Sequence, residues 1–269
     1  MIDLERETYP YLEEVNEGIL RQFARADGAP LRVLDVGCGQ ANLGAEIRAL
    51  GHVVWGIDAS PIAVAKAAPR IDRCLQVDLL DFNSVDAVLA DEQFDVIIFS
   101  DVLEHLYDPL AVLRFYCGFL KPTGRLLISV PNVLNWQTRL ALLFGRFEYR
   151  DTGVMDRTHV RFFTFRSARH LLEAAGCSIA KTDFTPHLTR VFLPVIKKVL
   201  APRAEATGQD PARTIIDSPL FRFYVRWIYP MEYVVGSSCR PLFAFRIVLV
   251  ARLARHHPSP TSVRAGGRR

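Results

Sequence analysis

The sequence lacks the features of a membrane-spanning, secreted or disulfide-bonded protein. None of its apolar runs approaches the roughly 18–20 residues that cross a bilayer, and its first residues are acidic, unlike a signal peptide. The five cysteines are widely spaced and contain no Cys-x-x-Cys pair, so we expect no disulfide framework and no bound metal. These absences favour a cytoplasmic protein. The composition of the 269 residues, 50% apolar and 23% charged, predicts a globular one.

Acidic residues are scarce toward the C-terminal end of the chain. Residues 1–185 hold 19 Lys/Arg against 25 Asp/Glu, whereas residues 186–269 hold 14 against 4. The net charge of +4 hides this division. Such an asymmetry is typical of chains that meet an anionic or membrane-facing partner at one end.

Short β-like runs alternate with helical segments between residue 31 and about residue 130. The runs are 31–36, 53–58, 73–77, 94–99 and 125–130, with a turn at 121–124 before the last of them. The pairs Ser60-Pro61 and Asp108-Pro109 each place a capping side chain before a proline at the first helical position. This alternation predicts an α/β fold with a parallel sheet and right-handed crossovers.

The alternation changes after residue 130. Residues 131–163 are rich in aromatic residues and arginine, and Thr164 is placed to cap a helix that ends at Gly176. Strand-like runs follow at 177–184 and 243–251, separated by a stretch of poor periodicity.

A glycine-rich loop joins the first predicted strand to the first predicted helix. It runs from Asp35 through Gly37 and Gly39, and closely spaced glycines let a ligand approach the backbone. A dinucleotide fingerprint needs glycine at position 42, where this chain has Asn42, and a Walker A loop needs Gly-Lys-Ser/Thr, which is absent. An acid two residues before the first glycine suits a ligand with a cationic group.

This loop resembles the first motif of the class I S-adenosylmethionine-dependent methyltransferases, an acidic residue followed by G-x-G-x-G. The match covers residues 33–39 and departs at Ala41, where the family usually has glycine; alanine is compatible with the loop if its φ is negative. Residues 94–105 resemble the fourth motif, and residues 120–125 resemble the turn before the fifth strand. The resemblance implies a Rossmann-like, seven-stranded, mostly parallel sheet with helices on both faces and an antiparallel last strand.

The resemblance also implies an S-adenosyl-L-methionine site at the carboxyl ends of the strands. The cofactor-binding residues that it assigns are Asp35, Gly37, Gly39, Asp58, Asp78, Leu79 and Ser100. By this resemblance, Asp58 would accept hydrogen bonds from the ribose hydroxyls and Asp78 would contact the adenine amino group. Each acid also has a simpler interpretation, namely loop-amide binding for Asp35, a helix N-terminal charge for Asp58 and a solvated loop acid for Asp78. Ser100 and Leu79 could be structural.

Two histidines are candidates for the base that a hydroxyl acceptor needs. His105 follows the fourth strand, at the edge where α/β sheets bind ligands, and His159 lies in a polar segment after the fifth strand. We favour His159, because its segment could form a wall of the acceptor site. Alternatively, His105 and Glu104 order the next helix, and His159 anchors its own segment by hydrogen bonds.

The stretch 149–164 resembles a subgroup of the family that accompanies bacterial surface-glycan and secondary-metabolite genes and is related to the ubiquinone-biosynthesis O-methyltransferases. The candidate substrate-binding residues are Tyr149, Arg157 and Arg161. The two arginines could bind an anionic group, or pair with Asp151 and Asp156. The resemblance implies methyl transfer to oxygen of a small-molecule, glycan or lipid-linked acceptor. N- or C-methylation and an inactive cofactor-binding partner subunit are the alternatives.

These assignments divide the chain into five parts. The parts are an N-terminal helical segment over the cofactor site (1–30), the cofactor-binding core (31–185), a basic and aromatic lid (186–240), the last core strand (241–252) and a disordered basic tail (253–269). Mixed aromatic and basic residues suit a cover over a hydrophobic substrate, or a surface that contacts anionic lipid headgroups. We hypothesise a lid that touches a membrane peripherally, with a packed cap or dimer contact as the alternative. No RNA-binding signature is visible, so we expect no nucleic-acid partner.

Overall fold

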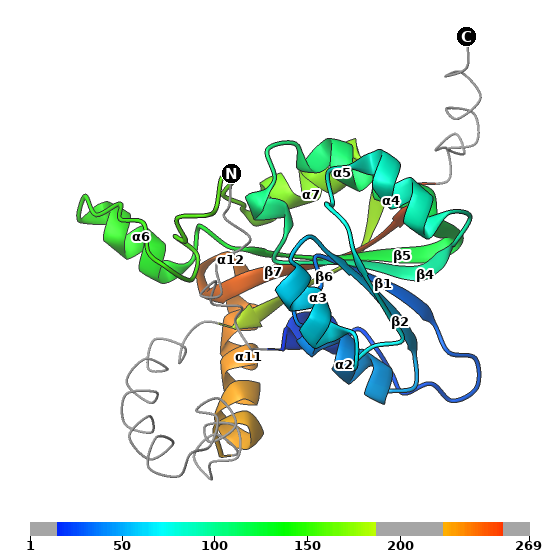
Figure 1. Ribbon diagram of the computed structural model, residues 1–269. Helices are drawn as coiled ribbons and strands as arrows, with labels where there is room; N and C mark the ends of the chain where they lie inside the picture. Colours follow the sequence, from blue (N-terminus) through cyan, green and yellow to red (C-terminus); the bar gives the residue numbers. More distant parts are fainter. Residues whose placement is uncertain (1–14, 187–222, 255–269) are drawn as a thin grey trace, which may run out of the picture.

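A seven-stranded sheet in the order β3-β2-β1-β4-β5-β7-β6 forms the centre of the computed structural model, which describes residues 15–186 and 223–254 (Figure 1). Its strands are β1 (Arg32–Val36), β2 (Val53–Asp58), β3 (Arg73–Gln76), β4 (Phe94–Ser100), β5 (Leu120–Pro131), β6 (Cys177–Pro186) and β7 (Ala244–Leu253). Neighbouring strands pair in parallel except at β7, which is antiparallel to both β5 and β6. The predicted fold class and the antiparallel last strand are confirmed.

Helices cover both faces of this sheet. One face carries α1 (Glu17–Leu20), α2 (Asn42–Ala49) and α3 (Pro61–Ala67), and the other carries α4 (Phe82–Leu89), α5 (Pro109–Tyr116) and α7 (Phe165–Ala174). Side chains of the central strands alternate between the two layers, so that Val33 packs with the first layer and Leu34 with the second. A parallel sheet buried on both faces requires such near-continuous apolar strands.

The remaining elements lie in the connections. Two 3-10 turns, η1 (Leu103–His105) and η2 (Cys117–Phe119), follow β4 and α5, and α6 (Trp136–Leu143) follows β5. A π-helical turn η4 (Tyr224–Ile228), α11 (Tyr229–Ser238) and α12 (Arg240–Phe243) precede β7. None of the helices described is long and apolar enough to span a bilayer. Large parts of the predicted N-terminal segment, lid and tail fall outside the described residues.

Side-chain caps begin three helices where the sequence predicted them. Ser60 accepts from the backbone N–H of Ala63, and Asp108 caps α5 ahead of its proline in the same way. Thr164 caps α7 with a reciprocal bond to Ser167, and the chain leaves that helix through Gly176 at a φ of +83°. The cap-and-proline signals therefore positioned the helices correctly.

The start of β5 differs from its prediction. The sequence predicted a turn at 121–124 and a strand at 125–130, but β5 begins at Leu120. Leu120 pairs with Phe94, and the next pair is Arg125 with Val96. Residues 121–124 are therefore taken up as an irregularity within the strand pairing, which lets a turn-like composition sit inside a strand.

Candidate active site

The predicted cofactor residues gather at one edge of the sheet. Asp35 lies near the carboxyl end of β1, Asp58 and Ser100 end β2 and β4, and Asp78 follows β3. Because the parallel strands all end at this edge, residues from position 35 to position 100 meet there. Open α/β sheets bind their ligands at this edge.

The loop between β1 and α2 has a backbone that small residues accept best. Gly37 and Gly39 have φ angles of +71° and +54°, and a Cβ on Gly37 would lie 2.8 Å from Val102 Cγ2. Ala41 also lies in the left-handed region, at a φ of +56°. The condition under which we expected alanine to fit, a negative φ at Ala41, is therefore not met. Alanine adopts this left-handed conformation at a cost of about 1 kcal/mol.

Asp58 holds this loop against the end of β2. Its carboxylate accepts from the backbone N–H of Gly39 and from that of Ser60, both at 2.9 Å. Burial raises the pKa of Asp58, and these amide bonds act in the opposite direction. The sequence left open that Asp35 binds a loop amide, but it is Asp58 that accepts from the amide of Gly39. The role of Asp58 toward ribose stays a prediction.

Asp35 is a buried carboxyl group that forms no hydrogen bond through its side chain within the described residues. Its side chain is almost inaccessible, with 3% of the residue exposed. Burial, and then the charge of Asp58, raise the pKa of Asp35 to about 7. A buried acid whose ionised form lacks a partner is suited to pair with a cationic ligand.

The other predicted cofactor residues contact the protein itself. Asp78 is exposed and accepts from the backbone N–H of Leu80, as a loop acid does. The carbonyl oxygen of Leu79 accepts from the Tyr116 hydroxyl at 3.3 Å. Ser100 Oγ accepts from the Asn16 side chain at 3.0 Å. Contacts of these residues with a cofactor stay predictions.

The two candidate histidines meet in one cluster. The ring centroids of His105 and His159 lie 4.9 Å apart. Nδ1 of His159 lies 3.1 Å from the carbonyl oxygen of Val154, and Nδ1 of His105 lies 3.2 Å from that of Thr158. A carbonyl oxygen only accepts, so each Nδ1 carries the proton and each Nε2 can accept one. Both candidates for the catalytic base therefore belong to the same site.

Glu104 completes this cluster and was absent from the site residues that we predicted. It is 1% exposed, and within the described residues neither of its carboxyl oxygens has a hydrogen-bond partner. Its Oε1 lies 4.0 Å from Nε2 of His159. Burial, and then Asp101, raise the pKa of Glu104 well above its usual range, while burial and His159 lower the pKa of His105. Burial therefore favours the neutral forms of Glu104 and His105.

The same three side chains also have the spacing of a cation site. One ligand atom each from Glu104, His105 and His159 lie within 4.8 Å of one another. Imidazole and carboxylate groups bind divalent transition metals, and metal-binding histidines commonly donate their other N–H to a carbonyl. From the sequence we expected no bound metal. By its chemistry, the cluster can hold either a proton or a cation.

A partly buried ionic network supports the edge of the sheet beside the cluster. Asp101, at a φ of +56°, accepts from Arg246 Nε at 2.6 Å and from Ser129 Oγ at 2.8 Å. The Asn16 side chain donates to Ser129 as well as to Ser100. Sequence reasoning missed Arg246, because it arrives on β7 and no local pattern links it to Asp101.

The predicted substrate residues lie on the surface beside the buried cluster. Arg157 pairs with Asp151 at 2.5 Å, and both side chains are exposed. Arg161 Nε donates to the carbonyl oxygen of Tyr107 at 3.0 Å, and Tyr149 is about half exposed. The ion pair of Arg157 is one of the alternatives that the sequence left open, and substrate contacts of the three residues stay predictions.

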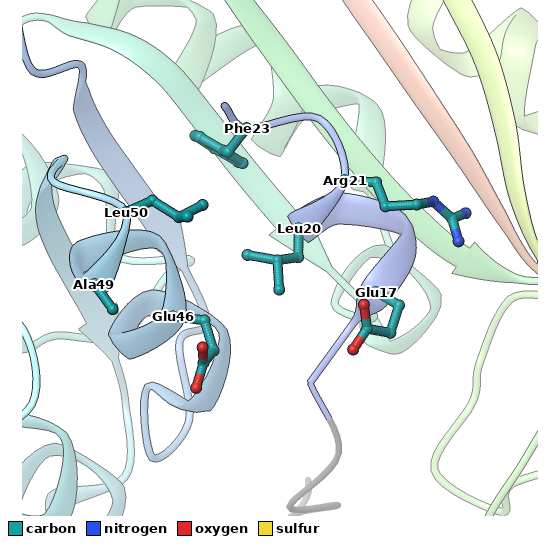
Figure 2. Close-up of a pocket in the computed structure, with 7 residues that line it drawn as sticks. All are labelled: Glu17, Leu20, Arg21, Phe23, Glu46, Ala49 and Leu50. Carbon is teal, nitrogen blue, oxygen red and sulfur yellow. The ribbon is translucent and has the colours of Figure 1, made fainter. Parts of the chain in front are cut away.

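A shallow hollow lies elsewhere, between α1 and the C-terminal end of α2 (Figure 2). It has a volume of about 300 Å³, and its lining residues are Glu17, Leu20, Arg21, Phe23, Glu46, Ala49 and Leu50. None of the predicted site residues lines it, so it plays no part in the candidate site.

Comparisons with known sequences identify the family to which the chain is similar. The family described as "Methyltransferase domain" matches residues 6–182. A ubiquinone biosynthesis O-methyltransferase of Cereibacter sphaeroides is 35% identical over 127 residues, which are 45% of this chain and 51% of the relative. The chain thus spans about half the length of the curated relatives it matches.

Solved structures share the fold. A SAM dependent methyltransferase from Archaeoglobus fulgidus aligns with a TM-score of 0.52 and 18% identity, covering 83% of this chain and 86% of that chain. Magnesium protoporphyrin IX methyltransferase from Synechocystis PCC 6803, with bound SAH, aligns with a TM-score of 0.50 and 17% identity, covering 84% and 75%.

Proposed function

The chain belongs to the class I S-adenosylmethionine-dependent methyltransferases, and from this premise we propose that it methylates an oxygen atom of a small-molecule, glycan or lipid-linked acceptor. S-adenosylmethionine is the methyl donor of this family and, when bound, supplies a methyl group that its sulfonium centre has already activated. What remains for the protein is to align the acceptor with that methyl group and to exclude water.

The loop after β1 is suited to hold the donor. Gly37 and Gly39 leave the backbone open to a ligand, and Asp58 keeps the loop in that shape. The Asp35 carboxyl group has no hydrogen-bond partner among the described residues, so a cationic group of the ligand would neutralise it. We assign the cofactor to these four residues.

The observation that carries the proposal is the buried cluster of Glu104, His105 and His159. A hydroxyl acceptor loses its proton as its oxygen is methylated, and Nε2 of His159 is the atom that would take it. Oε1 of Glu104 lies 4.0 Å from that atom, so its carboxyl group would stabilise the imidazolium once it has itself lost its proton. A neutral amine is already nucleophilic, so a hydroxyl acceptor gains more from such a base than an amine acceptor does. The relatives named ubiquinone biosynthesis O-methyltransferases support the same choice.

The test combines cofactor binding with turnover. Calorimetry with S-adenosylhomocysteine establishes binding, and mass spectrometry of a cell extract treated with protein and S-adenosylmethionine finds the methylated product. With that acceptor, His159→Gln should lower kcat by about 10²–10⁴-fold and leave cofactor affinity unchanged. His105→Gln is compared in parallel, and His170→Gln, an exposed histidine on α7, is the matched control.

Three outcomes would change the proposal. An unchanged kcat and pH profile in His159→Gln would remove this residue from the mechanism. Activity that a chelator abolishes and a divalent cation restores would assign the cluster to a cation instead of a proton. Cofactor binding without product in any extract or acceptor panel would favour the inactive partner subunit.

A further inference from the structure

The chain between β5 and α7 carries a helical arm that projects from the body of the protein. We define residues 134–149, which comprise α6 and the segment after it, as the α6 arm; Figure 1 shows it in green at the far left, beyond the sheet. Thr138 is the one buried residue of α6. Every residue from Leu142 to Thr152 is exposed. The arm therefore presents most of its surface to its surroundings.

The exposed side chains of the α6 arm are mostly large and apolar. They are Leu134, Leu140, Leu142, Leu143, Phe144, Phe147 and Tyr149. Leu143 is 78% exposed and Phe144 is 71% exposed. Single exposed apolar residues are normal on proteins, but contiguous ones mark interaction sites. The arm is an ordered element, since Asn135 caps α6 and Gly145 ends it at a φ of +70°.

Arginines are interspersed among these apolar side chains. Arg139 and Arg146 lie in the α6 arm and Arg150 follows it, and all three are exposed. Within the part of the chain that the structure describes, none of the three forms an ion pair. Glu148 is the single acid of the arm. Residues 134–150 therefore combine an apolar surface with a net charge of +2, and no carboxylate among the described residues pairs with these arginines.

We propose that the α6 arm binds the surface of an anionic lipid bilayer. Interfacial segments with this combination lie about 5–10 Å into the boundary between headgroups and acyl chains. Their arginines keep the aliphatic stem on apolar surface and the charged end among the phosphates. Arginine and aromatic residues also occur at protein interfaces, so a second copy of the chain is one of the outcomes that the test distinguishes.

The base of the α6 arm connects this surface to the candidate active site. Asn132 donates to the carbonyl oxygens of Pro241 and Ala244, and the backbone N–H of Val133 donates to that of Phe163. The chain that returns from the arm then supplies His159. A bilayer that holds the arm would bring a lipid-linked acceptor to the same edge of the sheet. Only this last step, the delivery of an acceptor, depends on the proposed function.

A second apolar surface provides a matched control. The sequence placed the membrane contact in the lid, 186–240, and the described part of that stretch also exposes apolar side chains. Just before η4 and along η4 and α11 these are Phe223, Trp227, Met231, Val234 and Val235. Met231 and Val234 are 68% and 70% exposed, close to the values of Leu143 and Phe144. Equivalent substitutions in the two surfaces therefore separate the α6 arm from the lid.

The experiment is co-sedimentation of the full chain with phosphatidylglycerol-containing vesicles and with pure phosphatidylcholine vesicles. The wild-type protein should sediment with the anionic vesicles only. Leu143→Glu/Phe144→Glu should weaken that binding at least tenfold, whereas Met231→Glu/Val234→Glu should leave it within about twofold. Replacing Arg139, Arg146 and Arg150 by Gln should weaken binding about fivefold for each arginine. Melting temperatures check that the variants, all at exposed positions, remain folded.

Several results would overturn the proposal. One is wild-type protein that stays in the supernatant with both kinds of vesicle. Another is an arm variant that sediments like the wild type, or a loss of binding confined to the Met231→Glu/Val234→Glu variant. Light scattering that shows a dimer dissociated by the arm variant, without vesicle binding, would assign the surface to a second copy of the chain. The assay measures binding alone, so a failure to find methylation leaves its result intact.

Discussion

The affinity for the cofactor should depend on pH through Asp35. Its buried carboxyl group has a pKa raised to about 7, so the free protein carries it partly protonated near neutral pH. A cationic group bound beside it favours the carboxylate, and binding therefore releases a proton. Affinity should rise with pH until the carboxyl group of the free protein is already ionised. Asp35→Asn should bind the cofactor more weakly and without this dependence.

The size of the effect follows from the pKa. Between pH 8 and pH 6 the ionised fraction of a group with a pKa of about 7 falls from about 0.9 to about 0.1, so Kd should rise about tenfold. The stability of the fold changes with pH in the opposite direction to the affinity for the cofactor. A carboxyl group whose pKa rises from 3.8 to about 7 on folding lowers stability progressively between those pH values, by up to about 4 kcal/mol above them. Unliganded Asp35→Asn should therefore melt at a higher temperature than the wild type at pH 8.

Calorimetry with S-adenosylhomocysteine at pH 6, 7 and 8, in two buffers of different ionisation enthalpy, measures both Kd and the protons released. Asp78→Asn, which removes an exposed acid from the same edge, is the control and should keep the pH dependence. Thermal melts without ligand give the stability change. The reasoning is refuted by a Kd that varies less than twofold between pH 6 and pH 8. An Asp35→Asn variant that binds like the wild type and gains no stability would refute it equally.

Two further predictions concern the backbone and the partly buried ion pair. Ala41→Gly should raise the melting temperature slightly, because alanine at a φ of +56° carries about 1 kcal/mol of strain. Ala45→Gly, within α2, is the control and should lower the melting temperature. Equal decreases in melting temperature at both positions would contradict this reasoning. Arg246→Met should lower the free energy of unfolding in urea by about 2 kcal/mol, less than for a fully buried pair, because the Asp101 that loses its counter-ion is 27% exposed. Adding Asp101→Asn should recover part of that loss, and a loss below about 1 kcal/mol in the single variant would show that the pair contributes little.

Signals between neighbouring residues predicted most of the fold. A cap followed by proline, as at Ser60, depends on the local backbone alone, and it placed its helix correctly. The start of β5 could not be predicted in this way. Residues 121–124 have the composition of a turn, but pairing of Leu120 with Phe94 across the sheet begins the strand before them. Contact between distant residues overrode the local preference there.

The candidate site, too, could be predicted only where local motifs determine the position of a residue. The motif around Asp35 and Asp58 predicted where those acids lie, because the loop and the strand ends follow from the fold. The meeting of His105 with His159 could not be predicted, since it depends on how the chain returns from the α6 arm. That return is held by the carbonyl oxygen of Glu104, which accepts from the backbone N–H groups of residues 160 and 161. No sequence pattern encodes a contact of that kind.

The place of β7 between β5 and β6 determines when the sheet of a nascent chain can be completed. This strand is the latest of the seven in the sequence, yet it lies between β5 and β6. While the ribosome has yet to release residues 244–253, β5 presents an unpaired edge and β6 has no neighbour in the sheet, a state prone to wrong pairing. Arg246 emerges with the same strand, so Asp101 receives its counter-ion only then. Closure of the sheet and neutralisation of the acid beside the candidate active site are therefore one event, which follows the synthesis of the other six strands.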